Sequence, residues 1–245
     1  MRDRDLYARI LNLSAPWSVR DVELDLKAEE VRVIVEVAAD AELVCPTCGR
    51  VCGRHDRRER RWRHLDTCQL RTVLVAQVPR VSCAEHGVHQ VAVPWADPGS
   101  AFTALFEALV IDWLKEASIQ AVAKRMGLSW DEADGIQGRA AARGLGRRAH
   151  QAPTRIGVDE TSFQKRHEYV TVVTDQDSGT VVHVADDRKQ ETMEAFLGTY
   201  SAQEREAIES VAMDMWGPYI AAVKATVPEA EEKICFDKYH VASHL

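Results

Sequence analysis

The stretch Ile156–Phe163, with the sequence Ile-Gly-Val-Asp-Glu-Thr-Ser-Phe, marks the start of a β-rich half of this 245-residue chain. Its apolar residues lead directly to Asp159, and carboxylates in such positions are frequent metal ligands. Glu160 comes next, but successive side chains of a strand face opposite sides of a sheet. We therefore expect Glu160 to point away from any site that contains Asp159.

The order of elements after residue 155 predicts a ribonuclease-H-like core. Three strand-like runs with short polar turns between them are typical of an antiparallel meander, and they cover residues 156–163, 168–174 and 180–185. Helical patterns then alternate with two further strand-like runs. The helices are predicted at residues 189–200, 202–208 and 216–225, and the strands at 210–214 and 233–237.

This order of elements gives Asp159 a partner. Asp159 on the first strand and Asp214 at the end of the fourth would lie beside each other on neighbouring central strands. A few carboxylate oxygens, together with water and phosphate oxygens, are the ligands that Mg²⁺ prefers, and two such ions can clamp an in-line phosphodiester displacement. The alternative is that each aspartate is a solvated residue at a strand end.

A zinc ribbon is predicted in the first half of the chain. Cys45-Pro-Thr-Cys48-Gly and Cys83-Ala-Glu-His86-Gly are two pairs with two-residue spacing, each followed by glycine and joined by β-type sequence. Three cysteines and one histidine form a common tetrahedral structural zinc site. The alternative is a set of reduced thiols in a core.

The choice of zinc ligands stays open at this point. Cys52 and His55 lie close to the first pair in sequence, and His89 lies close to the second. Cys68 and Cys235 have no partner at metal spacing, so we expect them to be small buried hydrophobic residues.

Charge is distributed unevenly along the chain. The net charge is −7, but residues 1–155 carry 23 Lys and Arg against 21 Asp and Glu, whereas residues 156–245 carry 8 against 17. A basic front and an acidic rear suit a protein that contacts phosphate with one part and holds cations with the other. The alternative is two solvated arginine faces. One cluster of arginines surrounds Trp62. Its members that we predict to contact DNA are Arg57, Arg58, Arg60 and Arg61.

A helix-turn-helix is predicted after a linker-like segment at residues 93–100. Apolar residues form two rows at i, i+4 spacing, which are Leu105, Leu109 and Trp113, and Phe106, Val110 and Leu114. A shorter helix over residues 119–126 ends at Gly127, and Ser129 with Glu132 forms a capping box for the next helix. The first turn of that helix is acidic, so the predicted DNA contacts lie later, at Gln137, Arg139, Arg143, Arg147 and Arg148. Residues 144–153 are predicted to be a basic linker.

The sequence predicts no membrane span, because no apolar run approaches the roughly 18–20 residues that are needed. The N-terminus alternates in charge and lacks the apolar core of a signal peptide. We therefore expect a cytoplasmic protein.

The chain resembles the ISL-three family of bacterial insertion-sequence transposases, which are enzymes with an acidic DDE triad. The matching segments are residues 45–49, 80–87, 93–96, 121–130, 156–160, 169–173, 213–215 and 236–241. The resemblance implies a zinc module, a helix-turn-helix and a ribonuclease-H-like catalytic domain. It also implies action on double-stranded DNA at the terminal inverted repeats, as a homo-oligomer, with Zn²⁺ as a structural ion and Mg²⁺ or Mn²⁺ as a catalytic ion. The bacterial origin of the chain, and association with the nucleoid when it is bound to DNA, are also what its resemblance to a bacterial family implies.

The resemblance also assigns catalytic residues. Asp159 and Asp214 match the first and second acids, and Asp237 with His240 matches a motif after the fifth strand with a possible accessory role. The third acid is expected on a later helix and is not found before Leu245. We therefore predict an α/β multidomain protein whose ribonuclease-H-like domain is incomplete and whose catalysis is doubtful. The alternative is a catalytically inactive, zinc-containing DNA-binding protein or regulator derived from a transposase.

Three domains are predicted. They are a β-rich zinc-ribbon domain at residues 1–96, a helix-turn-helix domain at 97–152 and a partial DDE catalytic domain at 153–245.

Overall fold

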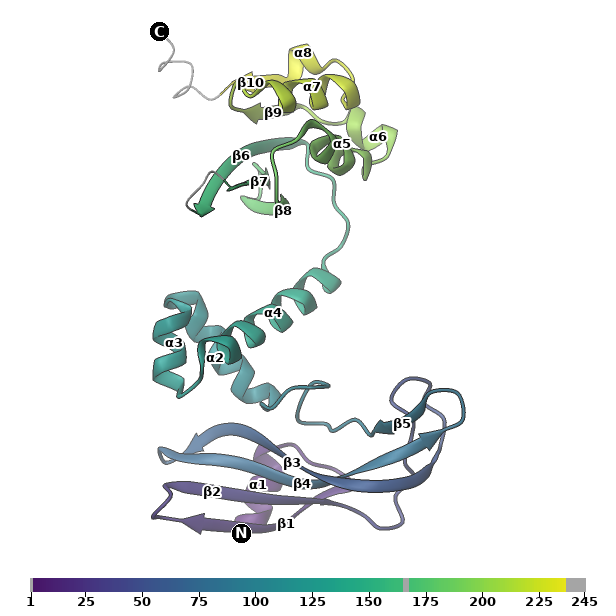
Figure 1. Ribbon diagram of the computed structural model, residues 1–245, viewed down its shortest axis with the longest axis vertical. Coiled ribbons are helices and arrows are strands. Elements are labelled where there is room, and N and C mark those ends of the chain that lie inside the picture. The colour runs from purple at the N-terminus through teal and green to yellow at the C-terminus, as the bar shows by residue number, and fades with distance from the viewer. Residues whose placement is uncertain (1, 165–167, 237–245) are drawn as a thin grey trace. The chain divides into compact units, whose positions relative to one another are not determined.

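The computed structural model describes residues 2–164 and 168–236, which divide into two compact units, Met1–Arg148 and Ala149–Leu245 (Figure 1). Each unit contains its own sheet and its own helices. The predicted boundary between residues 96 and 97 lies inside the first unit and stays a prediction. Asp237 and His240 lie outside the described residues.

The first unit contains a five-stranded sheet with the order β1-β2-β4-β3, and the short β5 pairs with β4. A short helix that the sequence pattern did not reveal, α1 (Asp3–Ile10), packs against this sheet. The strands are β1 (Trp17–Asp25), β2 (Glu30–Val37), β3 (Gly53–Thr67), β4 (Leu70–Cys83) and β5 (Gly87–Gln90). A turn at residues 26–29 joins β1 and β2 into an antiparallel hairpin.

Alternation along β2 builds the core of this sheet. Val31, Val33 and Val35 are all buried, as their period-two spacing predicts. Trp62 of β3 packs edge-on against Trp95, with ring centroids 5.3 Å apart. The aromatic residue in the arginine-rich strand is therefore a core residue, and only the arginines around it are available for contacts.

Three helices complete the first unit: α2 (Ala104–Glu116), α3 (Ile119–Met126) and α4 (Trp130–Arg147). The predicted helix-turn-helix is confirmed, including the Ser129–Glu132 capping box and the left-handed Gly127, with φ 65°, at the end of α3. The linker predicted from residue 144 begins later, because α4 continues to Arg147.

One of the two predicted apolar rows of α2 forms the core of the helices. Phe106 and Val110 are buried, together with Val122 and Ile136 of the next two helices. The other row, Leu105, Leu109 and Trp113, is exposed, and the guanidinium group of Arg125 stacks on Trp113 at 4.6 Å. The apolar face is therefore narrower than the sequence predicts.

The second unit contains a mixed sheet with the order β10-β9-β6-β7-β8. This is the order predicted for a ribonuclease-H-like core, with β6, β7 and β8 antiparallel and β9 and β10 parallel to β6. The strands are β6 (Arg155–Gln164), β7 (Glu168–Asp175), β8 (Thr180–Ala185), β9 (Ser210–Met213) and β10 (Ile234–Phe236). The helices are α5 (Gln190–Gly198), α6 (Ala202–Glu206), α7 (Gly217–Thr226) and α8 (Ala230–Lys233).

The core of the second unit lies on one face of its sheet. Ile156 and Val158 of β6 and Val211 and Met213 of β9 pack with residues of α5 and α7 (Figure 1). The intervening residues of these strands face the opposite side. Asp159 and Asp214 lie on that opposite side, so the sheet places them away from the helices. No helix in the described part of the chain has the length and apolar content to cross a membrane.

Candidate functional site

The four predicted zinc ligands come together at the end of the first sheet. Ligand atoms of Cys45, Cys48, Cys83 and His86 all lie within 4.8 Å of one another. The first pair sits in a tight loop after β2, in which the Gly49 amide donates to the Cys45 carbonyl at 2.9 Å. The second pair forms the turn between β4 and β5, where Cys83 is opposite Gly87.

The distances between these atoms fit a tetrahedral ion. The Sγ atoms of Cys48 and Cys83 are 3.8 Å apart, and the Nδ1 atom of His86 is 3.5 Å from Cys83 Sγ and 3.9 Å from Cys45 Sγ. Zn–S bonds of about 2.3 Å and Zn–N bonds of about 2.0 Å at tetrahedral angles require sulfur–sulfur separations of roughly 3.8 Å and sulfur–nitrogen separations of roughly 3.5 Å. The same distances are far too long for a disulfide.

Two of the three thiols are also prepared electrostatically for a cation, whereas burial and the neighbouring Cys45 and Cys83 raise the pKa of the Cys48 thiol against the lowering effect of the Arg50 amide. Amide N–H groups of His86 and Glu85 point at Cys83 and lower the pKa of its thiol to about 7. The amide of Cys48 lowers the pKa of Cys45 in the same way. Because the thiolate is the form that binds metal, these loops favour metal binding near neutral pH.

Three nearby residues that the spacing left as possible ligands are not part of this group. Cys52 Sγ donates to the Arg50 carbonyl at 3.4 Å, and His55 Nδ1 lies 3.3 Å from Ser82 Oγ. His89 Nε2 bonds to the His86 carbonyl at 2.6 Å. Of the residues that the structure describes, only Cys45, Cys48, Cys83 and His86 form a metal-binding group of three or more.

Cys68 and Cys235 are exposed, so the prediction that both are buried was wrong. Cys68 lies in the two-residue turn between β3 and β4, where it has a φ of 50° and Gln69 has a φ of 68°. Cys235 lies on the edge strand β10 with its side chain toward solvent. Neither position offers neighbours that would cover a side chain.

The predicted acidic pair lies on the open face of the second sheet. In the parallel ladder Ile156 is opposite Val211 and Gly157 is opposite Ala212. The same offset relates Asp159 of β6 to Asp214, which directly follows β9. Both aspartates line one open pocket of about 530 Å³.

Each aspartate is oriented by a backbone amide. Asp159 Oδ1 accepts from the Glu160 amide at 2.8 Å, and Asp214 Oδ1 accepts from the Trp216 amide at 3.1 Å. Within residues 2–164 and 168–236, the structure records no hydrogen bond to either Oδ2 atom, so each carboxylate keeps an oxygen for another ligand. Two such carboxylates, in an open pocket with room for water and phosphate oxygens, fit a hard divalent cation.

Gly157 lines this pocket at a position where a larger residue would collide with its neighbours. A Cβ atom added to Gly157 would lie 1.8 Å from Gln176 Nε2 and 2.6 Å from Thr174 Oγ1. The Gln176 side chain therefore lies across β6 beside the acidic pair, in space that any larger residue would fill.

Glu160 faces away from Asp159, as the strand period predicts, and it forms an ion pair on its own side of the sheet. Its carboxylate pairs with the Arg188 guanidinium group at 3.1 Å, and the Glu160 side chain is only 21% exposed. No local sequence pattern reveals this ion pair, because Glu160 and Arg188 are 28 positions apart in the chain.

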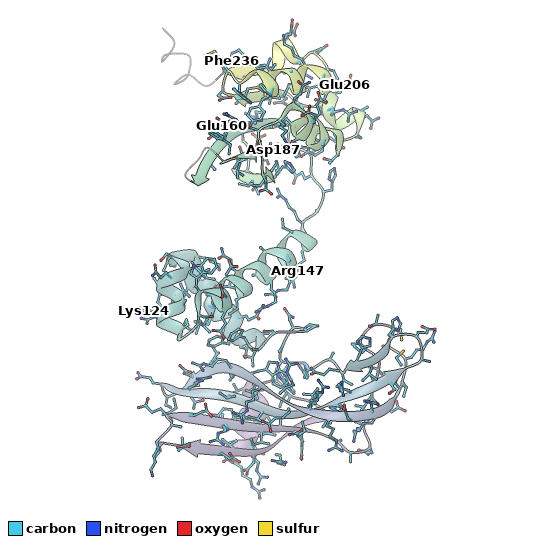
Figure 2. The ribbon with its side chains drawn as sticks, viewed as in Figure 1. Lys124, Arg147, Glu160, Asp187, Glu206 and Phe236 are labelled. Carbon is cyan, nitrogen blue, oxygen red and sulfur yellow. The ribbon has the colours of Figure 1, made fainter. Side chains whose placement is uncertain are left out.

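The predicted DNA contacts divide into two groups. Arg57, Arg58 and Arg61 are exposed on β3, Gln137 is exposed on α4, and Arg148 is exposed directly after α4. Arg147, which Figure 2 labels at the end of α4, is also exposed. Arg60 is partly buried over Trp62 and donates to Gln90 Oε1 at 3.2 Å. These residues stay predictions.

Arg139 and Arg143 form ion pairs within the first unit. Arg139 Nη2 lies 2.6 Å from a carboxylate oxygen of Glu107, and Arg143 Nη1 lies 2.5 Å from Asp97 and 3.6 Å from Glu107. Glu107 was not singled out from the sequence, because an acid within an amphipathic helix is typical of a solvated face. Arg139 and Arg143 thus take part in an ion-pair network within the first unit, and their contact with DNA stays a prediction.

Comparison with known proteins identifies all three parts of the chain. Residues 42–86 match a model described as the zinc-finger of transposase IS204/IS1001/IS1096/IS1165. Residues 91–137 match the helix-turn-helix domain of transposase family ISL3, and residues 156–245 match the transposase model of the same family. The matched segments have the same order as the zinc cluster, the helix-turn-helix and the sheet that carries the acidic pair.

Individual relatives agree with the family models. The chain is 32% identical over 253 residues to the transposase for insertion sequence element IS1557 of Mycobacterium tuberculosis, an alignment that covers 99% of this chain and 56% of the relative. It is 28% identical over 204 residues to the transposase for insertion sequence element IS1001 of Bordetella parapertussis, with 82% of this chain and 50% of the relative covered. The chain thus spans about half the length of the curated relatives that it matches. With its zinc-ribbon, DNA-binding helix-turn-helix and DDE segments in order, the chain belongs to the ISL3 (ISL-three) family of insertion-sequence transposases.

Proposed function

We propose that this chain binds the ends of an insertion sequence through its first unit and holds a divalent metal ion between Asp159 and Asp214. The terminal inverted repeats of the element are the proposed DNA target, and Mg²⁺ or Mn²⁺ is the proposed ion. The observation that carries the proposal is that Asp159 on β6 and Asp214, directly after the adjacent parallel strand β9, line one pocket.

The chemistry proposed for this pocket is phosphodiester transfer. A bound divalent ion would supply Lewis-acid stabilisation of a phosphate oxygen. The chain itself contributes two carboxylates with fixed orientation and an open face that double-stranded DNA can approach. Asp237 and His240 keep an accessory role in the proposal, on sequence grounds alone.

The zinc-binding loops and the helix-turn-helix are assigned to DNA recognition. The zinc cluster fixes the loop after β2 to the β4–β5 turn, at the end of β3 that carries Arg57 and Arg58. A zinc ion there would hold the basic strand in a defined shape. Because an element has two ends and each copy carries one such helix-turn-helix, we propose a homo-oligomer on the DNA.

A binding role without cleavage is the second candidate. Among the described residues, no third His, Cys or carboxylate joins Asp159 and Asp214 within metal-binding distance. Two carboxylates bind Mg²⁺ more weakly and orient it less well than three. In this role the chain would occupy element ends and compete with a catalytically active transposase.

One experiment separates these functions. The chain is incubated with labelled DNA that carries an element end, with random DNA as a control, in Mn²⁺ and in Mg²⁺. Preferential binding of the end without strand cleavage supports the second candidate. Cleavage that Asp159→Asn abolishes supports catalysis, and equal affinity for both DNAs contradicts recognition of the element ends.

A further inference from the structure

The turn that presents Asp214 rests on a cluster of side chains on the helix-covered side of the sheet. The guanidinium group of Arg188 lies between two aromatic rings, with its Cζ atom 3.9 Å from the Tyr169 ring centre and 4.4 Å from that of Trp216. Its Nη1 atom donates to both carboxylate oxygens of Glu160, at 3.1 and 3.4 Å. Planar stacking on two rings and a charged hydrogen bond restrict every rotation of this side chain.

Trp216 makes two contacts with Arg188, and its backbone amide makes a hydrogen bond with Asp214. The indole Nε1 donates to the Arg188 carbonyl at 3.2 Å, while the indole ring stacks on the Arg188 guanidinium group. The backbone amide of Trp216 donates to Asp214 Oδ1 at 3.1 Å. A shift of the indole would move this amide, since Trp216 is the residue immediately before α7.

The backbone carbonyl of Asp187, the residue before Arg188, is also held by a hydrogen bond. Thr171 Oγ1 of β7 donates to the carbonyl of Asp187, and it lies 2.7 Å from the hydroxyl of Tyr219 in α7. Tyr219 is fully buried. Arg188 follows Asp187 in the chain and forms an ion pair with Glu160. Figure 2 labels Glu160 and Asp187.

We propose that Arg188 is a positioning residue, which fixes the Asp214 carboxylate through Trp216. The inference rests on the proposed metal pair of Asp159 and Asp214. Arg188 contacts neither aspartate directly among the described contacts, so its effect passes through the Trp216 amide. Groups that orient a metal ligand in this way are typically worth about 10–100-fold in metal affinity.

The test is a titration of the whole chain with Mn²⁺, in which electron paramagnetic resonance measures the free ion. Asp159→Asn assigns the binding to the acidic pair. Arg188→Ala is expected to raise the dissociation constant about tenfold or more. Arg188→Lys keeps the charge beside Glu160 but has no plane to stack on the rings, so most of the loss of affinity should remain.

A second readout tests geometry and not only affinity. Trp216 is the only tryptophan in residues 149–245, so excitation of tryptophan can sensitise Tb³⁺ bound beside Asp214. The Tb³⁺ luminescence lifetime in H₂O and D₂O counts the bound waters. Arg188→Ala should add bound water, because a displaced Asp214 no longer occupies its coordination position.

The matched control is Arg205→Ala. Arg205 is also a partly buried arginine of this unit, and it donates to the Tyr200 carbonyl at 2.6 Å. Its removal is expected to leave the Mn²⁺ dissociation constant unchanged. If Arg188→Ala does not fold, Trp216→Phe removes the indole hydrogen bond while it keeps a smaller aromatic ring beside Arg188, and it should weaken Mn²⁺ binding in the same direction.

The outcomes are distinguishable. Unaltered Mn²⁺ affinity in folded Arg188→Ala, or an equal loss of affinity in Arg205→Ala, overturns the positioning role and leaves the metal pair intact. Absence of Asp159-dependent Mn²⁺ binding in the unaltered chain overturns the metal pair itself, and the positioning role with it.

Discussion

Arg139 donates two hydrogen bonds to one carboxylate oxygen of Glu107, at 3.1 and 2.6 Å, and the Glu107 side chain is only 3% exposed. Ser100 Oγ donates to the same oxygen at 2.7 Å. Glu107 lies on α2, Arg139 on α4 and Ser100 in the segment before α2. This buried carboxylate therefore connects the first and last helices of the helix-turn-helix with the segment that leads to them.

Glu107→Ala is expected to destabilise the first unit strongly. Removal of one partner from a fully buried ion pair costs about 3–5 kcal/mol, and because the Arg139 side chain is 33% exposed, water screens part of this loss and we expect the lower end of that range. Urea unfolding followed by tryptophan fluorescence measures the change, because five of the six tryptophans lie in this unit. Asp112→Ala is the control on the same helix, since its ion pair with Lys115 is exposed. Equal stability of the two variants would show that the Glu107 network does not support the fold.

His64 predicts a pH-dependent stability. Burial lowers the pKa of His64 to about 4, and the nearby Arg63 acts in the same direction. The imidazole Nδ1 lies 2.8 Å from Thr103 Oγ1, at the junction between β3 and α2. Because the pKa in the unfolded chain is about 6.5, the unfolded state binds the proton first as the pH falls.

The free energy of unfolding should therefore decrease between pH 6.5 and pH 4, by up to about 3 kcal/mol from this group alone. His64→Asn removes the titration and keeps a polar group near Thr103, so its stability should fall less over the same range. Unfolding curves at several pH values, with zinc present throughout, measure the difference. His55→Asn, which changes an exposed histidine of the same unit, should retain the full decrease. Parallel curves for His64→Asn and the unaltered chain would refute the assignment.

Features that depend on local sequence spacing could be predicted better than contacts between distant segments of the chain. Two C-x-x-C/H pairs bring four candidate ligands together because each pair is fixed by its own turn, and period-two alternation assigns Asp159 and Glu160 to opposite faces. The Glu107–Arg139 and Glu160–Arg188 pairs join distant segments, and no local pattern marks them. Cys68 escaped prediction for a different reason: it lies in a two-residue hairpin turn with positive φ, where Asn-Gly or Asp-Gly is the usual sequence.

Metal analysis should find about one Zn²⁺ per chain in protein purified without chelator. Cys48→Ser removes a predicted ligand and should lower the zinc content and destabilise the sheet, since zinc binding and folding are coupled. Cys52→Ser is the control, because Cys52 lies next to the same loop but outside the group of four. Equal zinc content in the two variants would contradict the assignment of Cys48, and absence of zinc in the unaltered chain would contradict the ribbon.

The exposed arginines of β3 should contact DNA phosphates. Arg57 and Arg58 have exposed side chains, and the structure records no ion pair for either among the described residues. The double variant Arg57→Gln/Arg58→Gln should weaken binding to all DNA sequences about equally. It should also reduce the slope of log K against log salt by roughly 0.9 for each phosphate that is no longer neutralised, because an arginine bound at a phosphate releases a condensed counterion.

Fluorescence anisotropy over a range of salt concentrations, with element-end and random DNA, measures both effects. Arg32→Gln is the matched control from the same sheet, because Arg32 already pairs with Glu23, Asp25 and Glu30. Its removal should leave the salt slope unchanged. A reduced affinity for element ends alone would mean that Arg57 or Arg58 contacts a base, because a phosphate contact carries no sequence information. An unchanged salt slope in the double variant would place the DNA on another surface of the first unit.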